Sequence, residues 1–305
     1  MLNRVSFRAM GCEMLAILEQ ETEAVPVILK DVPEWFEGWE QLLSRFRHNS
    51  ELSLLNRTFD QPIPVSSAFW NVFQTALWAD KLTEGLVTPT VLDAMLEAGY
   101  DQPFEQLSQR QNYSMLQTQV EIHPLSTVVA DKETQTINLP QGVHLDFGGV
   151  AKGWSAHQAM ERLQEHGPCV MNAGGDIAIS GPQVDGTPWP IGVSNPFETG
   201  EDLEVLHLKR CGIASSGKDR RHWNRNGLFS HHIIDPLTGQ PAETDLLRVT
   251  VVAPTVMEAE AAAKAAFILG REKGLEWIEE RPEFAGLMIL ESGEIIHSQR
   301  MQEYL

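Results

Sequence analysis

The feature that most constrains the fold is a change in the hydrophobic pattern near residue 126. From there to residue 254, short runs rich in apolar and β-branched residues alternate with Gly and Pro, interrupted by helical stretches. Short runs bounded by turn residues are typical of strands. The predicted strands lie in MLAIL (14–18), STVVAD (126–131), TQTINL (134–139), GVHLDF (142–147), CVMNAGG (169–175), DIAIS (176–180), WPIGVS (189–194), LFSHHIIDP (228–236) and LLRVTVVAP (246–254).

Helical spacing of apolar residues predicts helices at 34–47, 66–84, 152–166 and 256–269. Ser66 is placed to cap the second of these, and Thr255 with Glu258 forms the capping-box pattern before the last. The Gln-rich stretch 100–124 is weakly patterned, so we expect a surface excursion there. Strands and helices that do not alternate strictly indicate an α+β fold, with mixed β-sheets and flanking helices. Because no repeat or linker interrupts the chain, we expect a single domain over residues 1–305.

The charge balance limits the partners. The 305 residues include 23 basic and 42 acidic side chains, a formal net charge of −19. Nucleic acids and anionic membranes attract Lys and Arg, so a general binder of either is excluded. No apolar run reaches the roughly 18 residues of a membrane helix, and Met10-Gly11-Cys12 lacks the apolar stretch of a lipoprotein signal. We therefore expect no membrane anchor and a cytoplasmic protein, unless an export signal precedes this start.

A glycine-rich turn at 146–153 (DFGGVAKG) connects a predicted strand to a predicted helix. Gly148 and Gly149 permit close approach of the backbone to a ligand, and Lys152 adds a positive charge near the helix N-terminus. These properties favour a phosphate or pyrophosphate site, although the motif is neither G-x-G-x-x-G nor a Walker A loop. A tight strand-to-helix turn is the alternative interpretation.

Basic residues are concentrated between Lys209 and Arg225, where six stand with one acidic residue. Such an island in an acidic chain indicates either a local anion site or a solvated loop. Further on, His231 and His232 are adjacent in a predicted strand, so their side chains point to opposite faces and cannot bind one metal together. One of them is a candidate general base or substrate positioner, and a structural role is the alternative.

Glu260 and Lys264 stand one turn apart on the predicted helix 256–269, in the favourable orientation for an ion pair. Most of the other residues around them are alanines, which permit close packing. We therefore expect the pair to be partly enclosed, and a solvated surface pair is the alternative.

Taken in order, seven motifs resemble those of the ApbE family, the FAD:protein FMN transferases. The resemblance extends from about residue 10 to residue 270. The motifs are Met10-Gly11, Ser44-Arg45-Phe46 with 50–56, 85–91, 146–153, 172–176, Ser216-Gly217 and 232–239.

This resemblance implies an α+β fold that binds FAD as a substrate, with Mg²⁺ assisting cleavage of the FAD pyrophosphate. FMN would be joined through its phosphate to a Ser or Thr hydroxyl of a target flavoprotein, with release of AMP. By position it implies that His232 acts near the acceptor hydroxyl and that the Gly149 carbonyl is a metal ligand. The implied contacts to FAD are Met10, Phe46, Leu86, Val87, Thr88, Asp146, Lys152 and Ile233.

Three positions depart from the family pattern: Thr88 and Glu260 each replace an Asp, and Lys264 replaces a Thr. Glu260 can still bind Mg²⁺, whereas a protonated Lys264 brings a positive charge to the place of a ligand. We hypothesise that the Lys264 ammonium replaces the charge of the metal. FAD binding would then persist while transfer is weakened, lost or metal-independent. The alternatives are a non-catalytic FAD-binding module and an FAD pyrophosphate hydrolase.

Overall fold

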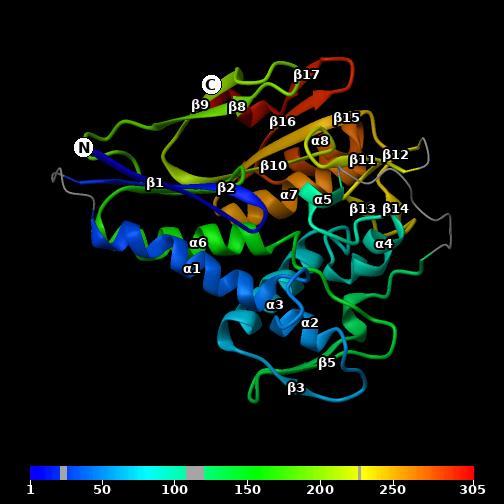
Figure 1. Ribbon diagram of the computed structural model, residues 1–305. Helices are drawn as coiled ribbons and strands as arrows, with labels where there is room; N and C mark the ends of the chain where they lie inside the picture. The colour runs from blue at the N-terminus through cyan, green and yellow to red at the C-terminus, as the bar shows by residue number, and fades with distance from the viewer. Residues whose placement is uncertain (21–25, 108–119, 226–227) are drawn as a thin grey trace. The chain divides into compact units, whose positions relative to one another are not determined.

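The computed structural model describes residues 1–20, 26–107, 120–225 and 228–305 (Figure 1). Packing divides the chain into two compact units. The first comprises Met1–Phe36, Lys152–Asp219 and Thr244–Leu305, and the second comprises Glu37–Ala151 and Arg220–Glu243. Both units are interrupted in sequence, so neither could be recognised as one continuous stretch of the chain.

Within the described part of the first unit, eight strands form one sheet, and every neighbouring pair in it is antiparallel. Together with the helices, this sheet confirms the predicted α+β class. In sheet order, the strands are β1 (Leu2–Ala9), β2 (Cys12–Glu19), β6 (Cys169–Ala173), β7 (Asp176–Ser180), β10 (Arg210–Gly217), β15 (Leu246–Ala253), β16 (Ala285–Leu290) and β17 (Ile295–His297).

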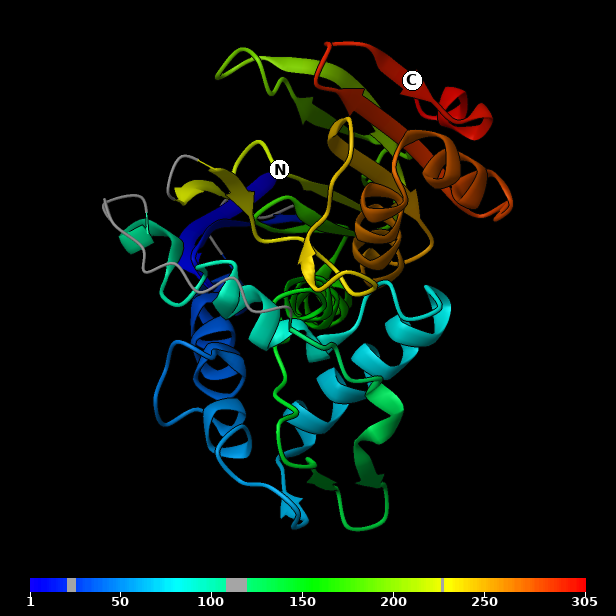
Figure 2. The same cartoon turned by 90° about the vertical axis from the view of Figure 1, so that its right-hand side faces the viewer.

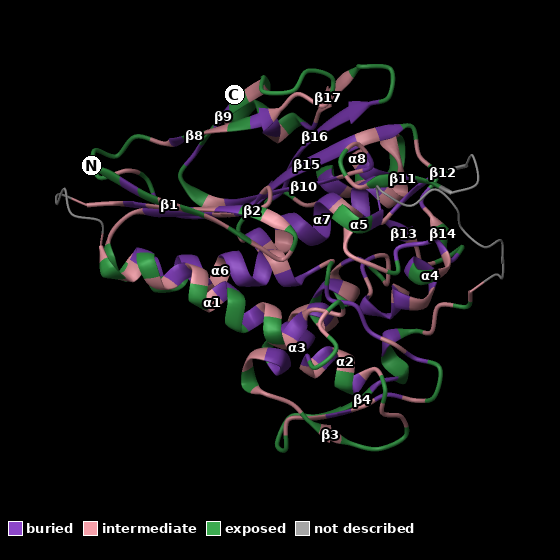
Figure 3. Cartoon of the chain, in the orientation of Figure 1, coloured by how far each residue is buried: buried purple, intermediate pink, exposed green. Residues whose placement is uncertain are grey.

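Helix α7 (Val256–Leu269) packs against β10 and β15 on one face of this sheet, on the same side as α6 (Ala151–Leu163) (Figures 1 and 2). The predicted capping box is confirmed, because Thr255 and Glu258 each bond the other's backbone N–H. The alanines of α7 are buried, and Figure 3 shows this part of the unit in the buried colour. Small side chains let the helix lie close to the strands. Helix α8 (Arg271–Glu279) follows directly.

The opposite face of the sheet is covered by the hairpin of β8 (Trp189–Ser194) and β9 (Asp202–Leu208) (Figure 1). Ile177 and Ile179 of β7 belong to the core cluster formed with this hairpin. Because side chains alternate along a strand, Asp176 points to the other face, where the helices lie. This alternation brings a carboxylate to the helical side of the sheet.

The described residues of the second unit form helices, one three-stranded sheet and two hairpins. Its core cluster consists of Ala94, Met95, Ala98, Tyr100, Leu107, Trp223 and Ile234. The elements are α2 (Glu51–Leu55), β3 (Ile63–Pro64), α3 (Ser67–Leu82), α4 (Leu92–Glu97), α5 (Phe104–Leu107), β4 (Val129–Asp131), β5 (Thr136–Asn138), β11 (His222–Arg225), β12 (Leu228–His231), β13 (Ile234–Asp235) and β14 (Gln240–Pro241). In the described parts of both units, no helix combines the length and apolar character needed to span a membrane.

Two predicted strands need correction. The segment 142–147 forms no strand, because its backbone bonds elsewhere. Both backbone groups of Leu145 bond the side-chain amide of Asn56 at 2.8 Å, and the Asp146 N–H donates to Pro89 O. The run 228–236 is divided between β12 and β13, so His232 stands just outside a strand.

Two helical-region predictions also change. The first helix, α1 (Val27–Leu43), begins and ends earlier than predicted, because Leu29, Val32 and Phe36 continue its buried face across Pro33. The segment 100–124 lies partly outside the described residues. Where it is described, Tyr100 and Leu107 are buried, so its beginning is part of the core and not a surface excursion.

Candidate functional site

Lys152 lies between two buried carboxylates in the first unit. Its Nζ is 3.0 Å from Glu260 Oε1 and also donates to Asp176 Oδ2. The side chains of Asp176 and Glu260 are 2% and 3% exposed, and that of Lys152 is 18% exposed. We call Lys152, Asp176, Glu260 and Lys264 the charge cluster.

A glycine makes this arrangement sterically possible. Gly153 follows Lys152 on α6, and its N–H donates to Glu260 Oε2 at 2.9 Å. A Cβ at position 153 would lie 2.7 Å from the same oxygen and 3.2 Å from Val256 O. The two helices therefore approach through the missing side chain, and both oxygens of Glu260 have partners.

The electrostatics fix a positive charge at Lys152. Burial alone lowers the pKa of Lys152, but the charges of Asp176 and Glu260 outweigh it and raise that pKa above its usual value. Burial, with Asp176 nearby, raises the pKa of Glu260, while Lys152 and Lys264 oppose the rise. The interpretation of the Gly148-Gly149 turn as an anion site thus loses part of its support, because the charge of Lys152 is already shared by two carboxylates.

Glu260 has a partner beyond the helix of the expected pair with Lys264. The ion pair seen at Glu260 is with Lys152 of α6, and Lys264 acts on Glu260 through its charge. The expected enclosure is confirmed for Glu260, which is buried, whereas Lys264 is half-buried.

Met10 belongs to the same unit, in the tight turn between β1 and β2. Met10 and Gly11 have φ values of +50° and +68°, the left-handed conformation of a two-residue hairpin turn. The turn brings Met10 Sδ to 3.9 Å from Ser155 Oγ, one helical turn after Lys152. Met10 therefore lies beside α6, the helix that carries Lys152 of the charge cluster.

In the second unit, Arg45 links two predicted flavin contacts, Phe46 and Asp146. Its Nε lies 2.9 Å from Asp146 Oδ2, and both side chains are buried. The guanidinium carbon is 4.0 Å from the centre of the Phe46 ring, which is 39% exposed. Asp146 also accepts the Gly148 N–H at 2.7 Å. The structure thus places the guanidinium of Arg45 against the partly exposed ring of Phe46, and Asp146 balances the charge of Arg45.

Tyr100 connects this group to His232. The Tyr100 ring centre is 5.8 Å from that of Phe46 and 6.5 Å from that of His232, and its carbonyl accepts a bond from Arg45. His232 Nδ1 lies 3.3 Å from Arg221 O. His231 is buried, with Nε2 3.1 Å from Ala242 O, so it has the structural role and His232 is the candidate for chemistry.

The remaining flavin contacts lie after α3 and beside His232. Leu86 and Thr88 are half-buried and Val87 is buried, with its N–H bonded to Thr83 Oγ1. Burial raises the pKa of Asp80 although Thr88 donates a hydrogen bond to it. Ile233 is buried.

The charge cluster does not suit Mg²⁺. That ion requires about six oxygen ligands in a nearly octahedral arrangement. The carboxylates of Asp176 and Glu260 are already engaged by Lys152 and the Gly153 N–H, and position 264 carries an ammonium. Across the ranges that the structure describes, no group of three or more His, Cys, Asp or Glu is placed to hold a metal ion. Gly149, whose carbonyl the resemblance implies as a metal ligand, lies in the turn before α6, and its role stays a prediction.

The basic island is partly structural. Lys218 is buried, with Nζ 2.6 Å from Thr244 O and 2.8 Å from Glu291 Oε1, so its charge is balanced within the protein. Asp219 pairs with the buried Arg248. Lys209 and Arg210 are exposed, and an anion site there stays a prediction.

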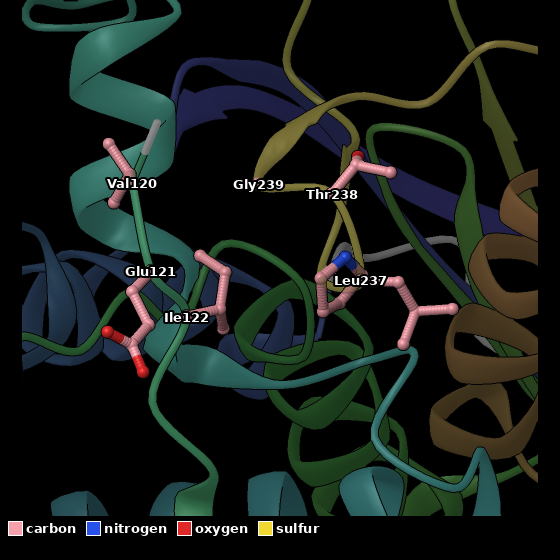
Figure 4. Close-up of a pocket in the computed structure, with 7 residues that line it drawn as sticks. Val120, Glu121, Ile122, Leu237, Thr238 and Gly239 are labelled. Atoms are coloured by element: carbon pink, nitrogen blue, oxygen red, sulfur yellow. The ribbon is translucent and has the colours of Figure 1, made fainter. Parts of the chain in front are cut away.

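A pocket of about 430 Å³ lies in the second unit, beside the loop that follows His232. Figure 4 shows its two walls facing each other. None of the predicted flavin contacts lines it. The lining residues are Val120, Glu121, Ile122, Pro236, Leu237, Thr238 and Gly239.

Arg45, Tyr100 and Asp176 were not predicted as site residues. Arg45 and Asp176 lie inside two of the seven motifs, which could have indicated them. Tyr100 gave no local signal, because its role comes from packing against residues distant in sequence.

Comparison with known proteins agrees with these motifs. A model of the ApbE family matches residues 10–288. This chain belongs to the ApbE family. A relative from Haemophilus influenzae, named FAD:protein FMN transferase, is 34% identical over 87% of this chain and 77% of its own length. One from Treponema pallidum with the same name is 27% identical over 91% of this chain and 81% of its own.

Solved ApbE structures share the fold. An ApbE protein from Thermotoga maritima matches with a TM-score of 0.88 at 23% identity, covering 100% of this chain and 99% of its own. A flavin transferase ApbE from Vibrio cholerae matches with a TM-score of 0.80 at 24% identity, covering 100% of both chains.

Proposed function

We propose that this ApbE protein is an FAD:protein FMN transferase, which moves FMN from FAD to a Ser or Thr hydroxyl of a target flavoprotein and releases AMP. The observation that carries the proposal is the family match over residues 10–288, joined to a relative of that name at 34% identity. The pairing of an exposed aromatic ring with a candidate base through Tyr100 supports it.

The reaction exchanges one phosphorus–oxygen bond for another. The acceptor oxygen bonds the phosphorus on the FMN side of the pyrophosphate, and the bond from that phosphorus to the bridging oxygen breaks. The bridging oxygen leaves with AMP. The proton of the acceptor hydroxyl passes to His232, which has the residue type of a general base. Such transfers depend mainly on positioning and on neutralising phosphate charge.

The residues predicted to contact FAD differ in the kind of contact they offer. Phe46 offers an exposed ring for stacking on the flavin. The guanidinium of Arg45 contacts this ring and pairs with Asp146. The resemblance implies further contacts to FAD from Leu86, Val87, Thr88 and Ile233. The resemblance also implies contacts from Met10 and Lys152. The resemblance also implies Mg²⁺, but the donor set does not suit it, so no step is assigned to a metal.

Incubation with FAD and peptides bearing Ser or Thr tests the function. We expect AMP in solution and peptide carrying FMN by mass spectrometry, in equal amounts. AMP without labelled peptide would favour an FAD pyrophosphate hydrolase. Bound FAD without either product would favour a non-catalytic flavin-binding module.

A further inference from the structure

The chain after α3 folds back on the last turn of that helix and brings Thr88 to Asp80. The Gly85 N–H donates to Asp80 O at 2.8 Å. The Val87 N–H donates to Thr83 Oγ1 at 2.9 Å. The hydroxyl of Thr88 donates a hydrogen bond to the half-buried carboxylate of Asp80. The turn thus holds a carboxylate against a residue for which the resemblance implies a contact to FAD.

A second hydroxyl bonds the same oxygen of Thr88. Thr88 Oγ1 lies 3.0 Å from Thr90 Oγ1, and Thr90 is buried. A hydroxyl has one proton to donate and two lone pairs that accept. Because Thr88 gives its proton to Asp80, Thr90 is the donor of the second bond. One lone pair of Thr88 Oγ1 remains, so this hydroxyl can act toward a ligand only as an acceptor.

Thr88 is connected to the partly exposed ring of Phe46 within the second unit. The Asp146 N–H donates at 2.8 Å to the carbonyl oxygen of Pro89, the residue after Thr88. Asp146 pairs with Arg45, whose guanidinium lies against the Phe46 ring. A short series of contacts therefore joins the Thr88 hydroxyl to the ring that we propose to stack on the flavin.

We infer that Asp80 is a positioning residue for FAD, which holds the Thr88 hydroxyl as the acceptor for a hydrogen-bond donor of the flavin nucleotide. The inference rests on the proposed function and on the contact that the resemblance implies for Thr88. The family pattern has an Asp at position 88, and an ionised carboxylate only accepts hydrogen bonds. A threonine by itself could donate or accept. Asp80 therefore gives Thr88 the polarity of the residue that it replaces.

A double-mutant cycle on FAD affinity tests the inference. Fluorescence titration with FAD gives the Kd of the wild type, Asp80→Leu, Thr88→Val and the double variant. We expect each single substitution to weaken binding about 5-fold, the size of one net hydrogen bond. The double variant should bind no more weakly than Thr88→Val, because Asp80 acts through that hydroxyl. An unchanged Kd for Asp80→Leu, or effects of the two substitutions that multiply, would overturn the inference.

Glu84→Gln is the matched control, because it removes an exposed negative charge from the same turn. FAD is itself an anion, so the loss of a carboxylate should by charge alone leave binding unchanged or strengthen it. We expect the Kd of Glu84→Gln to stay at the wild-type value or to fall. Equal weakening of binding in Glu84→Gln and Asp80→Leu would contradict the role of the hydroxyl.

A gain of binding provides the second arm, which a misfolded variant cannot imitate. Thr88→Asp restores the family residue but places two carboxylates side by side, so it should bind FAD more weakly than the wild type. Adding Asp80→Asn should strengthen binding about 5-fold in this background, because an amide can donate to the new carboxylate. No gain from the second substitution would overturn the inference.

Transfer is measured separately on the same proteins. Bound FAD without AMP or labelled peptide would overturn the proposed function as a transferase, and the two binding experiments would still decide the inference. A wild type that binds no FAD would overturn both.

Discussion

At the scale of single residues, the account depends on how buried charges are partnered. Lys152 is held by Asp176 and Glu260, and Asp146 is held by Arg45. A buried charge that loses its partner is costly, while a matched pair is roughly neutral. Each pair can therefore be examined by removing one member and then both.

Replacing Arg45 by Met should destabilise the protein by about 3–5 kcal/mol, because Asp146 would be left buried without its cation. The double variant Arg45→Met/Asp146→Asn should recover most of this loss. Urea unfolding monitored by circular dichroism measures both. A double variant as unstable as the single one would show that the pair is not the cause.

Gly153→Ala should destabilise by about 1–3 kcal/mol, because the new Cβ would meet Glu260 Oε2 at 2.7 Å. Gly38→Ala is the matched control. Gly38 is in α1 with nothing near its missing side chain, so alanine should stabilise by about 1 kcal/mol there. Thermal unfolding of the two variants should shift in opposite directions, and equal shifts would contradict the steric account.

At the scale of elements, side-chain bonds replace regular structure at the segment 142–147. Asn56 takes both backbone groups of Leu145, and His144 Nδ1 lies 2.8 Å from Asp93 Oδ2 on α4. The segment is thereby joined to two helices without being a strand.

This attachment should depend on pH. The hydrogen bond to Asp93 raises the pKa of His144, although burial opposes the rise. The stabilisation is therefore fully present below the unfolded-state pKa of about 6.5 and is lost as the pH rises through the higher folded-state value. Urea unfolding across this range should show a smaller decline for Asp93→Asn than for the wild type. Parallel curves would contradict the assignment.

Local chemistry explains which elements could be predicted. The capping box of α7 and the Ser66 cap of α3 involve neighbours in sequence, and both are present. The strand predicted at 142–147 failed because Asn56 is far away in the chain. The candidate site is similar: the motifs predict His232 and Lys152, whose roles stay predictions, but Tyr100 is recognised only through its packing.

At the scale of the whole molecule, this protein of net charge −19 holds several of its cations buried or half-buried against carboxylates. Lys152, Lys218 and Arg248 are each paired with a carboxylate. The acidic surplus is therefore a property of the surface, and the prediction that general nucleic-acid binding is excluded rests on it.

The prediction of a single domain leads to a calorimetric test. Each unit is built from separate stretches of the chain, so we expect their folding to be coupled and thermal unfolding to give one transition. Two resolved transitions would contradict the single-domain proposal.

The most direct measurement of the central claim is the intact mass of an acceptor peptide after incubation with FAD, for the wild type and for His232→Asn. We predict that the wild type adds one FMN to a Ser or Thr and that the variant adds FMN about 100-fold more slowly, as expected when a general base is lost. An acceptor that keeps its original mass while the wild type has FAD bound would contradict the account.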